Sequence, residues 1–211
     1  MGMADQQGYV LVVDDIPDIL KLLDATLEFK GYRVVTARNG EEALEAIRQE
    51  RPALVIADIL MPKMDGFSLL RRIRLDPDTR HIPVVFLSAT YVAAEDKDFA
   101  RALGVTRFIE KPVDWEEFLP IISDILTKGV PITPTSLNEV EFYNRYRQRL
   151  ETKLKQKVTQ IARDEHLLKT LSESEKPTIE STLQQAIQER DELIIILDQV
   201  SERLEKFSNS K

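Results

Sequence analysis

Aspartate, serine and lysine side chains stand where four apolar segments of the sequence end. Asp14 and Asp15 follow the first segment, Asp58 ends the third, Ser88 ends the fourth and Lys111 follows the fifth. Carboxylates that meet at one point repel one another unless a cation lies among them, and an oxygen-only cluster suits Mg²⁺. A lysine and a hydroxyl facing the same point supply charge neutralisation and a hydrogen bond to a phosphoryl group. A carboxylate there can accept that group.

The segments that carry these side chains are short, rich in Val and Ile, and alternate with helical patterns. Such runs are typical of strands buried in a parallel sheet. The helical patterns each show an apolar face and end near a glycine or proline, such as Gly31, Pro52 or Gly104. The alternation predicts an α/β fold in which helices cover both faces of the sheet through right-handed crossovers. The five runs are 9–13, 33–37, 54–58, 84–88 and 107–110.

In a doubly wound parallel sheet, ligands bind beyond the carboxyl ends of the strands. Each polar residue taken alone has an ordinary explanation, since an aspartate after a strand is commonly a helix N-cap and a lone lysine lies on the surface. Their joint placement at strand ends is what indicates a site.

Four stretches resemble the response-regulator receiver family of two-component signalling and together span roughly residues 8–128. They are VLVVDD at 10–15, VIADILMPKMDG at 55–66, PVVFLSA at 83–89 and FIEKP at 108–112. The resemblance implies a doubly wound receiver fold of five strand–helix units with strand order 2-1-3-4-5. It also implies phosphorylation by a histidine kinase or a histidine phosphotransfer protein, with Mg²⁺ as cofactor and no enzymatic activity beyond the chain's own phosphorylation and dephosphorylation.

The resemblance assigns roles to individual positions. Asp58 would be the phosphoacceptor. Asp14, Asp15, Asp58 and the backbone carbonyl of Leu60 would hold the metal ion.

The same resemblance extends to the fourth and fifth segments. Ser88 and Lys111 would bind the phosphoryl oxygens, and Ser88 and Phe108 would form the conformational switch. The bond before Pro112 would be cis. Neither Leu60 nor Thr90, the residues two positions after the acceptor and after Ser88, could readily orient an attacking water. We therefore predict slow loss of the phosphoryl group.

Bulk composition restricts the class of protein. The 211 residues include no cysteine, and the net charge is −7, which argues against general nucleic-acid affinity. No apolar run approaches the roughly 20 residues of a membrane span, and the first residues do not resemble a signal peptide, so we expect a cytoplasmic protein. We expect a receiver domain at 1–128, a linker at 129–136 and a helical extension at 137–211.

The extension carries heptad-spaced apolar residues on two segments separated by a polar break, which predicts an antiparallel coiled-coil hairpin. The first row is Val140, Tyr143, Leu150, Leu154, Ile161, Leu168 and Leu171, interrupted by Arg147, Lys157 and Asp164. The second row is Ile179, Leu183, Ala186, Leu193, Leu197, Val200, Leu204 and Phe207, interrupted by Arg190.

A two-helix hairpin buries little apolar surface alone, so a homodimer with a four-helix bundle is the favoured arrangement. Packing of the hairpin onto its own receiver or onto another protein stays open. Two other functions also stay open: a phosphorelay intermediate that uses His166, and a scaffold dimer. No helix-turn-helix or basic zipper region appears in the sequence.

Overall fold

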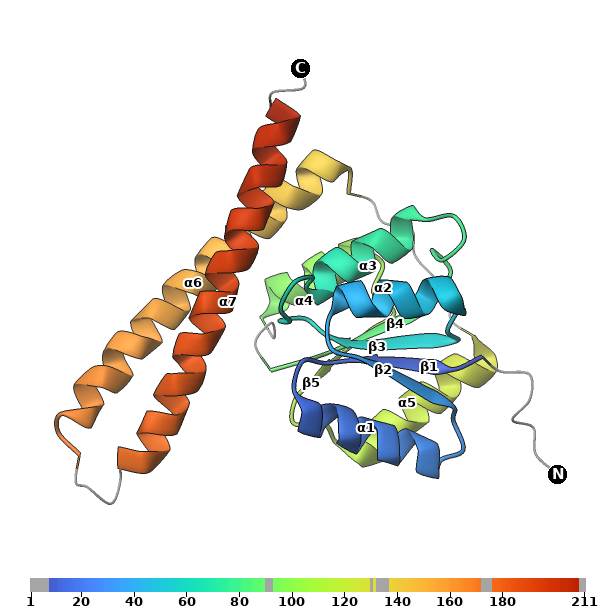
Figure 1. Ribbon diagram of the computed structural model, residues 1–211, viewed down its shortest axis with the longest axis horizontal. Coiled ribbons are helices and arrows are strands. Elements are labelled where there is room, and N and C mark those ends of the chain that lie inside the picture. The colour runs from blue at the N-terminus through green and yellow to red at the C-terminus, as the bar shows by residue number, and fades with distance from the viewer. Residues whose placement is uncertain (1–7, 90–92, 130, 132–136, 172–175, 209–211) are drawn as a thin grey trace. The chain divides into compact units, whose positions relative to one another are not determined.

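The computed structural model describes residues 8–89, 93–129, 131, 137–171 and 176–208. The chain divides into two compact units, Met1–Ser136 and Leu137–Lys211 (Figure 1). The first unit contains a parallel sheet and the second contains two long helices.

The sheet has five parallel strands in the order β2-β1-β3-β4-β5, which confirms the predicted fold class. Register brings the last residue of β1, Val13, level with Ala37 of β2 and Ala57 of β3. The carboxyl ends of the strands therefore share one edge of the sheet. The strands are β1 (Val10–Val13), β2 (Val34–Ala37), β3 (Leu54–Asp58), β4 (Val84–Ser88) and β5 (Arg107–Glu110).

Five helices cover the two faces of this sheet, with α1 and α5 on one face and α2, α3 and α4 on the other (Figure 1). Side chains of Asn39, Asp65 and Asp114 accept backbone hydrogen bonds at the starts of α2, α3 and α5, which fixes where these helices begin. The helices are α1 (Pro17–Phe29), α2 (Gly40–Gln49), α3 (Gly66–Leu75), α4 (Ala94–Ala102) and α5 (Trp115–Lys128).

Buried apolar side chains hold the central strands in place from both sides. Leu23 and Leu27 of α1 and Ile122 of α5 belong to the core cluster that covers one face of the sheet. On α3, the ring of Phe67 packs edge-on against Phe86 of β4, with centroids 5.4 Å apart. Burial on both faces is what keeps the strand ends, and hence the polar side chains on them, in fixed positions.

Arg74 of α3 is a buried cation that the sequence pattern does not reveal. Its guanidinium donates hydrogen bonds of 2.8–3.0 Å to the carbonyl oxygens of Arg80, Ile82 and Gly104. Burial lowers the pKa of Arg74 to about 10. Carbonyl oxygens thus satisfy the guanidinium in place of a carboxylate. Because these carbonyls belong to the loops before β4 and after α4, the side chain connects α3 to both loops.

The second unit is a pair of antiparallel helices, α6 (Glu139–Leu168) and α7 (Lys176–Ser208), that lie against each other. Leu150 and Ile161 of α6 and Leu193 of α7 are buried, as the heptad rows predict. None of the helices in the described ranges is long and apolar enough to cross a bilayer.

The start of the α6 row differs from the prediction. Val140 is 44% exposed and Tyr143 half-buried, whereas Phe142 and Tyr146 are buried. Large aromatic rings bury more apolar area than a valine, so they take the inward positions two and three residues along the helix. The ring of Tyr143 still approaches Phe207 of α7, with centroids 6.0 Å apart.

Two polar interruptions of the α6 row, Lys157 and Asp164, are largely buried, whereas a third, Arg147, is exposed. Lys157 of α6 forms an ion pair of 2.6 Å with Glu189 of α7, and both side chains are less than one-fifth exposed. Asp164 is 4% exposed and lies 3.4 Å from Arg163. Of these contacts only Lys157–Glu189 joins the two helices, and a buried ion pair between helices contributes more to a defined register than to stability.

Candidate functional site

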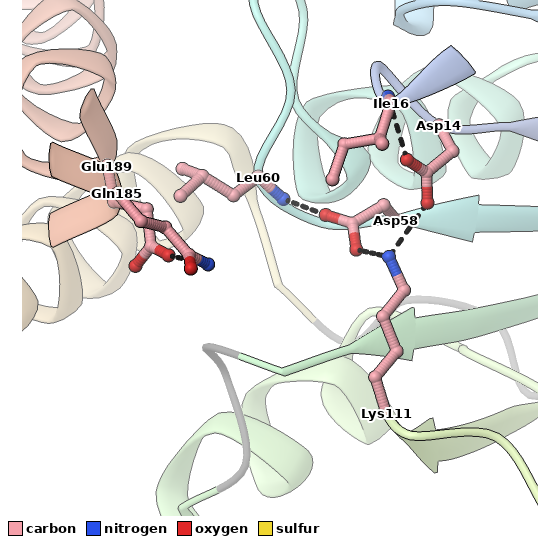
Figure 2. Close-up of polar contacts among 7 residues, drawn as sticks. All are labelled: Asp14, Ile16, Asp58, Leu60, Lys111, Gln185 and Glu189. Carbon is pink, nitrogen blue, oxygen red and sulfur yellow. Dashed lines mark hydrogen bonds and ion pairs between the residues drawn. The ribbon is translucent and has the colours of Figure 1, made fainter. Parts of the chain in front are cut away.

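Two carboxylates and one ammonium group meet at the carboxyl edge of the sheet (Figure 2). Asp14 directly follows β1, Asp58 ends β3 and Lys111 directly follows β5. The Nζ atom of Lys111 donates to Asp14 Oδ2 at 2.7 Å and to Asp58 Oδ1 at 2.6 Å. Residues that are 97 and 53 positions apart in the sequence therefore share one ion-pair network.

Backbone amides hold the second oxygen of each carboxylate. The amide of Ile16 donates to Asp14 Oδ1 at 3.0 Å, and the amide of Leu60 donates to Asp58 Oδ2 at 2.7 Å. Asp14 is 1% exposed and Asp58 is 9% exposed. Both side chains are thus fixed in orientation by the loops that follow their strands, before any ligand arrives.

The electrostatics of this cluster favour the binding of further positive charge. Burial raises the pKa of Asp58 to about 6, and the Asp14 carboxylate adds to this effect, whereas Lys111 and the Leu60 amide oppose it. Burial lowers the pKa of Lys111, but the carboxylates of Asp58 and Asp14 raise it further, so the net shift is upward. Burial and the adjacent Asp14 also raise the pKa of Asp15. Carboxylates whose pKa values are raised in this way gain from a nearby cation.

Asp15 is half-buried and does not join the Lys111 network. Within the described ranges, no three Asp, Glu, His or Cys side chains converge as metal ligands. The structure thus brings together Asp14, Asp58 and Lys111 from the predicted residues, with Leu60 contributing its amide.

The predicted phosphoryl-binding and switch positions lie beside this network. Ser88 ends β4 and is 1% exposed, and its carbonyl oxygen accepts a hydrogen bond from the amide of Lys111 at 3.0 Å. Phe108 of β5 is half-buried, and its ring centroid lies 6.4 Å from that of Phe86. The peptide bond between Lys111 and Pro112 is cis. Thr90 lies outside the described residues.

The loop between β3 and α3 is shaped by a close backbone approach at Gly66. The amide of Gly66 donates to the carbonyl of Ile59 at 2.8 Å. A Cβ atom at Gly66 would lie 2.4 Å from the carbonyl oxygen of Asp58 and 2.9 Å from the Cα of Ile59. Lys63 in the same loop has a positive φ of 65°. Only glycine fits at position 66, because both neighbours are backbone atoms that cannot rotate away.

We expect Gly66→Ala to disturb the site, because the added methyl group must displace the backbone that carries Asp58. The free energy of unfolding should fall by about 2 kcal/mol or more, as expected for overpacking against backbone. Urea unfolding measures this loss, and a Mg²⁺ titration measures the accompanying loss of cation affinity.

Gly31→Ala is the matched control for this substitution. Gly31 also has a positive φ, of 87°, but nothing lies within 4 Å of an added Cβ. The control should therefore lose only about 1 kcal/mol from backbone strain. Equal losses in the two variants would show that contact with Asp58 is not the cause.

A doubly wound parallel sheet with fixed carboxylates and a lysine at its carboxyl edge defines the receiver class of signalling protein. Residues 10–123 match the response regulator receiver domain family. The chain therefore belongs to this family of signalling phosphoacceptors in two-component systems.

Individual relatives support the same assignment. The chain is 36% identical over 135 residues to "Probable transcriptional regulator ycf27" of Pyropia yezoensis. The aligned region covers 64% of this chain and 54% of that protein. It thus spans about half the length of that relative.

Solved structures give the same result. A putative response regulator from Chloroflexus aurantiacus is 31% identical, covers 57% of this chain and 98% of its own, and has a TM-score of 0.54. The chemotaxis response regulator CheY4 of Vibrio cholerae is 32% identical, covers 57% of this chain and 100% of its own, and has a TM-score of 0.53.

Proposed function

We propose that this chain is a response regulator that accepts a phosphoryl group on Asp58 from a histidine kinase or a histidine phosphotransfer protein. The observation that carries the proposal is the ion-pair network in which Lys111 contacts both Asp14 and Asp58. A buried carboxylate beside a lysine is suited to accept a phosphoryl group, because the ammonium group can neutralise the charge that the new phosphate brings.

Mg²⁺ fits the donor set at this edge of the sheet. Asp14 and Asp58 are close enough to share one ammonium group, and Mg²⁺ needs only one or two carboxylates, since waters and carbonyl oxygens complete its shell. We propose that Asp14, Asp15 and Asp58, with the carbonyl of Leu60, hold the ion. When bound, it would neutralise charge on the phosphoryl oxygens during transfer.

Residues of the chain itself accept the phosphoryl group, orient the acceptor and bind the product. A carboxylate oxygen of Asp58 forms the bond to phosphorus while the phosphorus–nitrogen bond of the donor's phosphohistidine breaks and the imidazole leaves. The Leu60 amide holds the other oxygen and so keeps the acceptor oriented. Lys111 would then pair with the phosphoryl group, and Ser88 would donate a hydrogen bond to it. Movement of Ser88 toward the phosphate would change the rotamer of Phe108.

We propose that the α6–α7 hairpin carries the output as a protein-interaction or homodimerisation element of a cytoplasmic protein. Its partly buried pair Lys157–Glu189 and its aromatic contact Tyr143–Phe207 support a defined helix pairing that could respond to the receiver. DNA binding is not part of the proposal, since no described element supplies a helix-turn-helix.

The direct test is incubation of the full chain with acetyl phosphate, with and without Mg²⁺, followed by intact-mass measurement. We expect addition of one phosphoryl group only when Mg²⁺ is present. Borohydride reduction and peptide mapping should then place the modification at Asp58. Modification of His166 instead would favour the phosphorelay alternative, and no modification with either acetyl phosphate or a phosphorylated donor protein would overturn the proposal.

Mg²⁺ affinity should depend on pH with a midpoint near 6. The pKa of Asp58 is raised to about 6, so below that pH its carboxyl group must lose a proton before it can hold a cation. Affinity measured by calorimetry should fall roughly tenfold per pH unit well below the midpoint. The pKa of Asp58 is higher in the folded state than in the unfolded chain. The contribution of Asp58 to the free energy of unfolding of the metal-free protein should therefore decline as pH rises from about 4 to about 6. An affinity that is constant from pH 5 to pH 7 would contradict this assignment.

The phosphoryl group should be lost slowly, over minutes or longer. Leu60 is 7% exposed and its side chain has no atom that could orient a water molecule. Decay of the phosphorylated mass after removal of acetyl phosphate measures the rate. Leu60→Asn would add a carboxamide and should accelerate the decay, whereas Leu60→Met should not. A half-life of seconds in the unaltered chain would disprove the expectation.

A further inference from the structure

One side of the α6–α7 hairpin exposes apolar side chains that neither helix covers. Val158 of α6 is 49% exposed and Ile194 of α7 is 39% exposed. Leu154 of α6 and Ile187 of α7 are half-buried. These four residues are here called the lateral face. Apolar residues gathered on one side of a helical hairpin mark an interaction surface rather than ordinary scatter.

Helix periodicity places all four residues on the same side. Each residue advances the helix by about 100°, so Val158 lies about 80° beyond the buried Leu150, and Ile194 about 100° beyond the buried Leu193. Both displacements have the same rotational sense. In antiparallel helices, equal displacement from the shared seam points to the same side of the hairpin.

The register of the hairpin brings these residues to matching levels. The ion pair between Lys157 and Glu189 sets residue 157 opposite residue 189. Val158 and Ile187 then lie at nearly the same level, one on each helix. The lateral face is therefore a continuous strip across both helices rather than two separate patches.

The side of the hairpin that carries the lateral face is large enough for a stable protein–protein interface. Helices of 30 and 33 residues are about 45–50 Å long and, side by side, about 20 Å wide. This whole side therefore measures roughly 900 Å² per copy, close to the area of about 800 Å² per partner that specific interfaces bury. The lateral face occupies its middle, because Leu154 and Ile194 lie near the midpoints of α6 and α7.

Charge favours a second copy of the chain as the occupant. Over its whole length α6 carries seven Lys or Arg and five Asp or Glu, whereas α7 carries seven Asp or Glu and four Lys or Arg. Two hairpins related by a two-fold axis parallel to the helices place α6 of each copy on α7 of the other. A cationic helix then meets an anionic helix twice, and repulsion between like helices is avoided.

We infer that the lateral face binds the lateral face of a second copy, forming a four-helix bundle in which α6 of one chain packs on α7 of the other. In this arrangement Val158 of one copy meets Ile187 of its partner at the same level. The inference rests on the proposed role of the hairpin as the output element, and it identifies the partner and the surface.

The first experiment measures the mass of the full chain by light scattering on a sizing column and its dimer dissociation constant by sedimentation equilibrium. We expect twice the chain mass of 24.2 kDa. Val158→Glu and Ile194→Glu should each weaken the dimer at least tenfold, about 1.4 kcal/mol or more. Ile195→Glu is the matched control, since Ile195 is 56% exposed but its position on the helix points away from the lateral face. A monomer at all concentrations, or equal weakening by Ile195→Glu, would overturn the inference.

The second experiment tests the pairing of α6 with α7, using the absence of cysteine from the chain. Chains carrying only Val158→Cys are mixed with chains carrying only Ile187→Cys and then oxidised gently. We expect the mixed disulfide to exceed both symmetric ones. Dominant symmetric disulfides would refute the arrangement.

Folding and receiver function are checked separately in the same variants. Circular dichroism should show unchanged helix content, and acetyl phosphate labelling should persist in the dimer-deficient variants. A dimer that forms normally while the unaltered chain is labelled neither by acetyl phosphate nor by a phosphorylated donor protein would refute the proposed phosphoacceptor function and leave the dimer intact.

Discussion

Asp58→Asn should abolish phosphoryl incorporation by the chain. Asparagine has nearly the same shape as aspartate, so the fold of the loop should persist and the Leu60 amide should still have an acceptor. The amide side chain, however, has no carboxylate oxygen that could form an acyl phosphate. Intact-mass measurement after incubation with acetyl phosphate and Mg²⁺ should show only unmodified chain.

The same substitution should not destabilise the metal-free protein at pH 7. Burial raises the pKa of Asp58 to about 6, so ionisation of this carboxyl group is less favourable in the folded state than in the unfolded chain, although the group is still mostly ionised at pH 7. A neutral amide removes this unfavourable term, and Lys111 keeps its ion pair with Asp14. Urea unfolding of both proteins in the presence of a chelator tests the expectation.

Asp65→Asn is the matched control for this experiment. Asp65 lies in the same loop and caps α3 by accepting a hydrogen bond from the amide of Ser68 at 2.9 Å. Asparagine is an equally good N-cap residue, so this variant should be phosphorylated normally. Incorporation that survives in Asp58→Asn would show that another residue is the acceptor.

Lys111→Met should have the largest effect on stability. The substitution keeps the length of the side chain but removes the only cation that contacts both Asp14 and Asp58 among the described residues. Two buried carboxylates then keep their backbone hydrogen bonds but have lost the positive charge between them. Loss of one partner from a buried ion pair typically costs about 3–5 kcal/mol, and we expect a loss of this order at pH 7 without Mg²⁺.

Two further observations separate this electrostatic effect from a packing defect. Mg²⁺ should stabilise Lys111→Met more than the unaltered chain, because it replaces the missing positive charge. Lys111→Arg retains the charge and should keep most of the stability, although its planar guanidinium has a different geometry. If Lys111→Met unfolds at the same urea concentration as the unaltered chain, the network does not stabilise the fold.

Most of the receiver fold could be predicted from the sequence, because strand burial on both faces leaves a local signature. The apolar runs at 54–58, 84–88 and 107–110 coincide with β3, β4 and β5, and the glycine at position 31 follows the end of α1. Continuous Val and Ile runs and helix-ending residues act over a few positions, so no tertiary information is needed to read them.

The hairpin shows where local pattern stops being sufficient. Two antiparallel helices follow from the heptad spacing. The same spacing assigns Val140 to the seam, yet Val140 is exposed, whereas Phe142 and Tyr146 are buried. Apolar residues on adjacent faces compete for the same inward direction. Only the packing of the folded helices decides which of these side chains are buried.

Local sequence patterns are enough to place Asp14, Asp58, Ser88 and Lys111 at the ends of parallel strands, because each strand end is marked by its neighbouring residues and parallel strands end at the same side of the sheet. The hydrogen bonds of Lys111 to both Asp14 and Asp58, which do not include Asp15, are evident only in the folded chain. The buried Arg74 with its carbonyl partners was equally invisible in the sequence. These contacts depend on the distances between residues far apart in the chain and on the burial of each charged group. Local sequence patterns contain neither quantity.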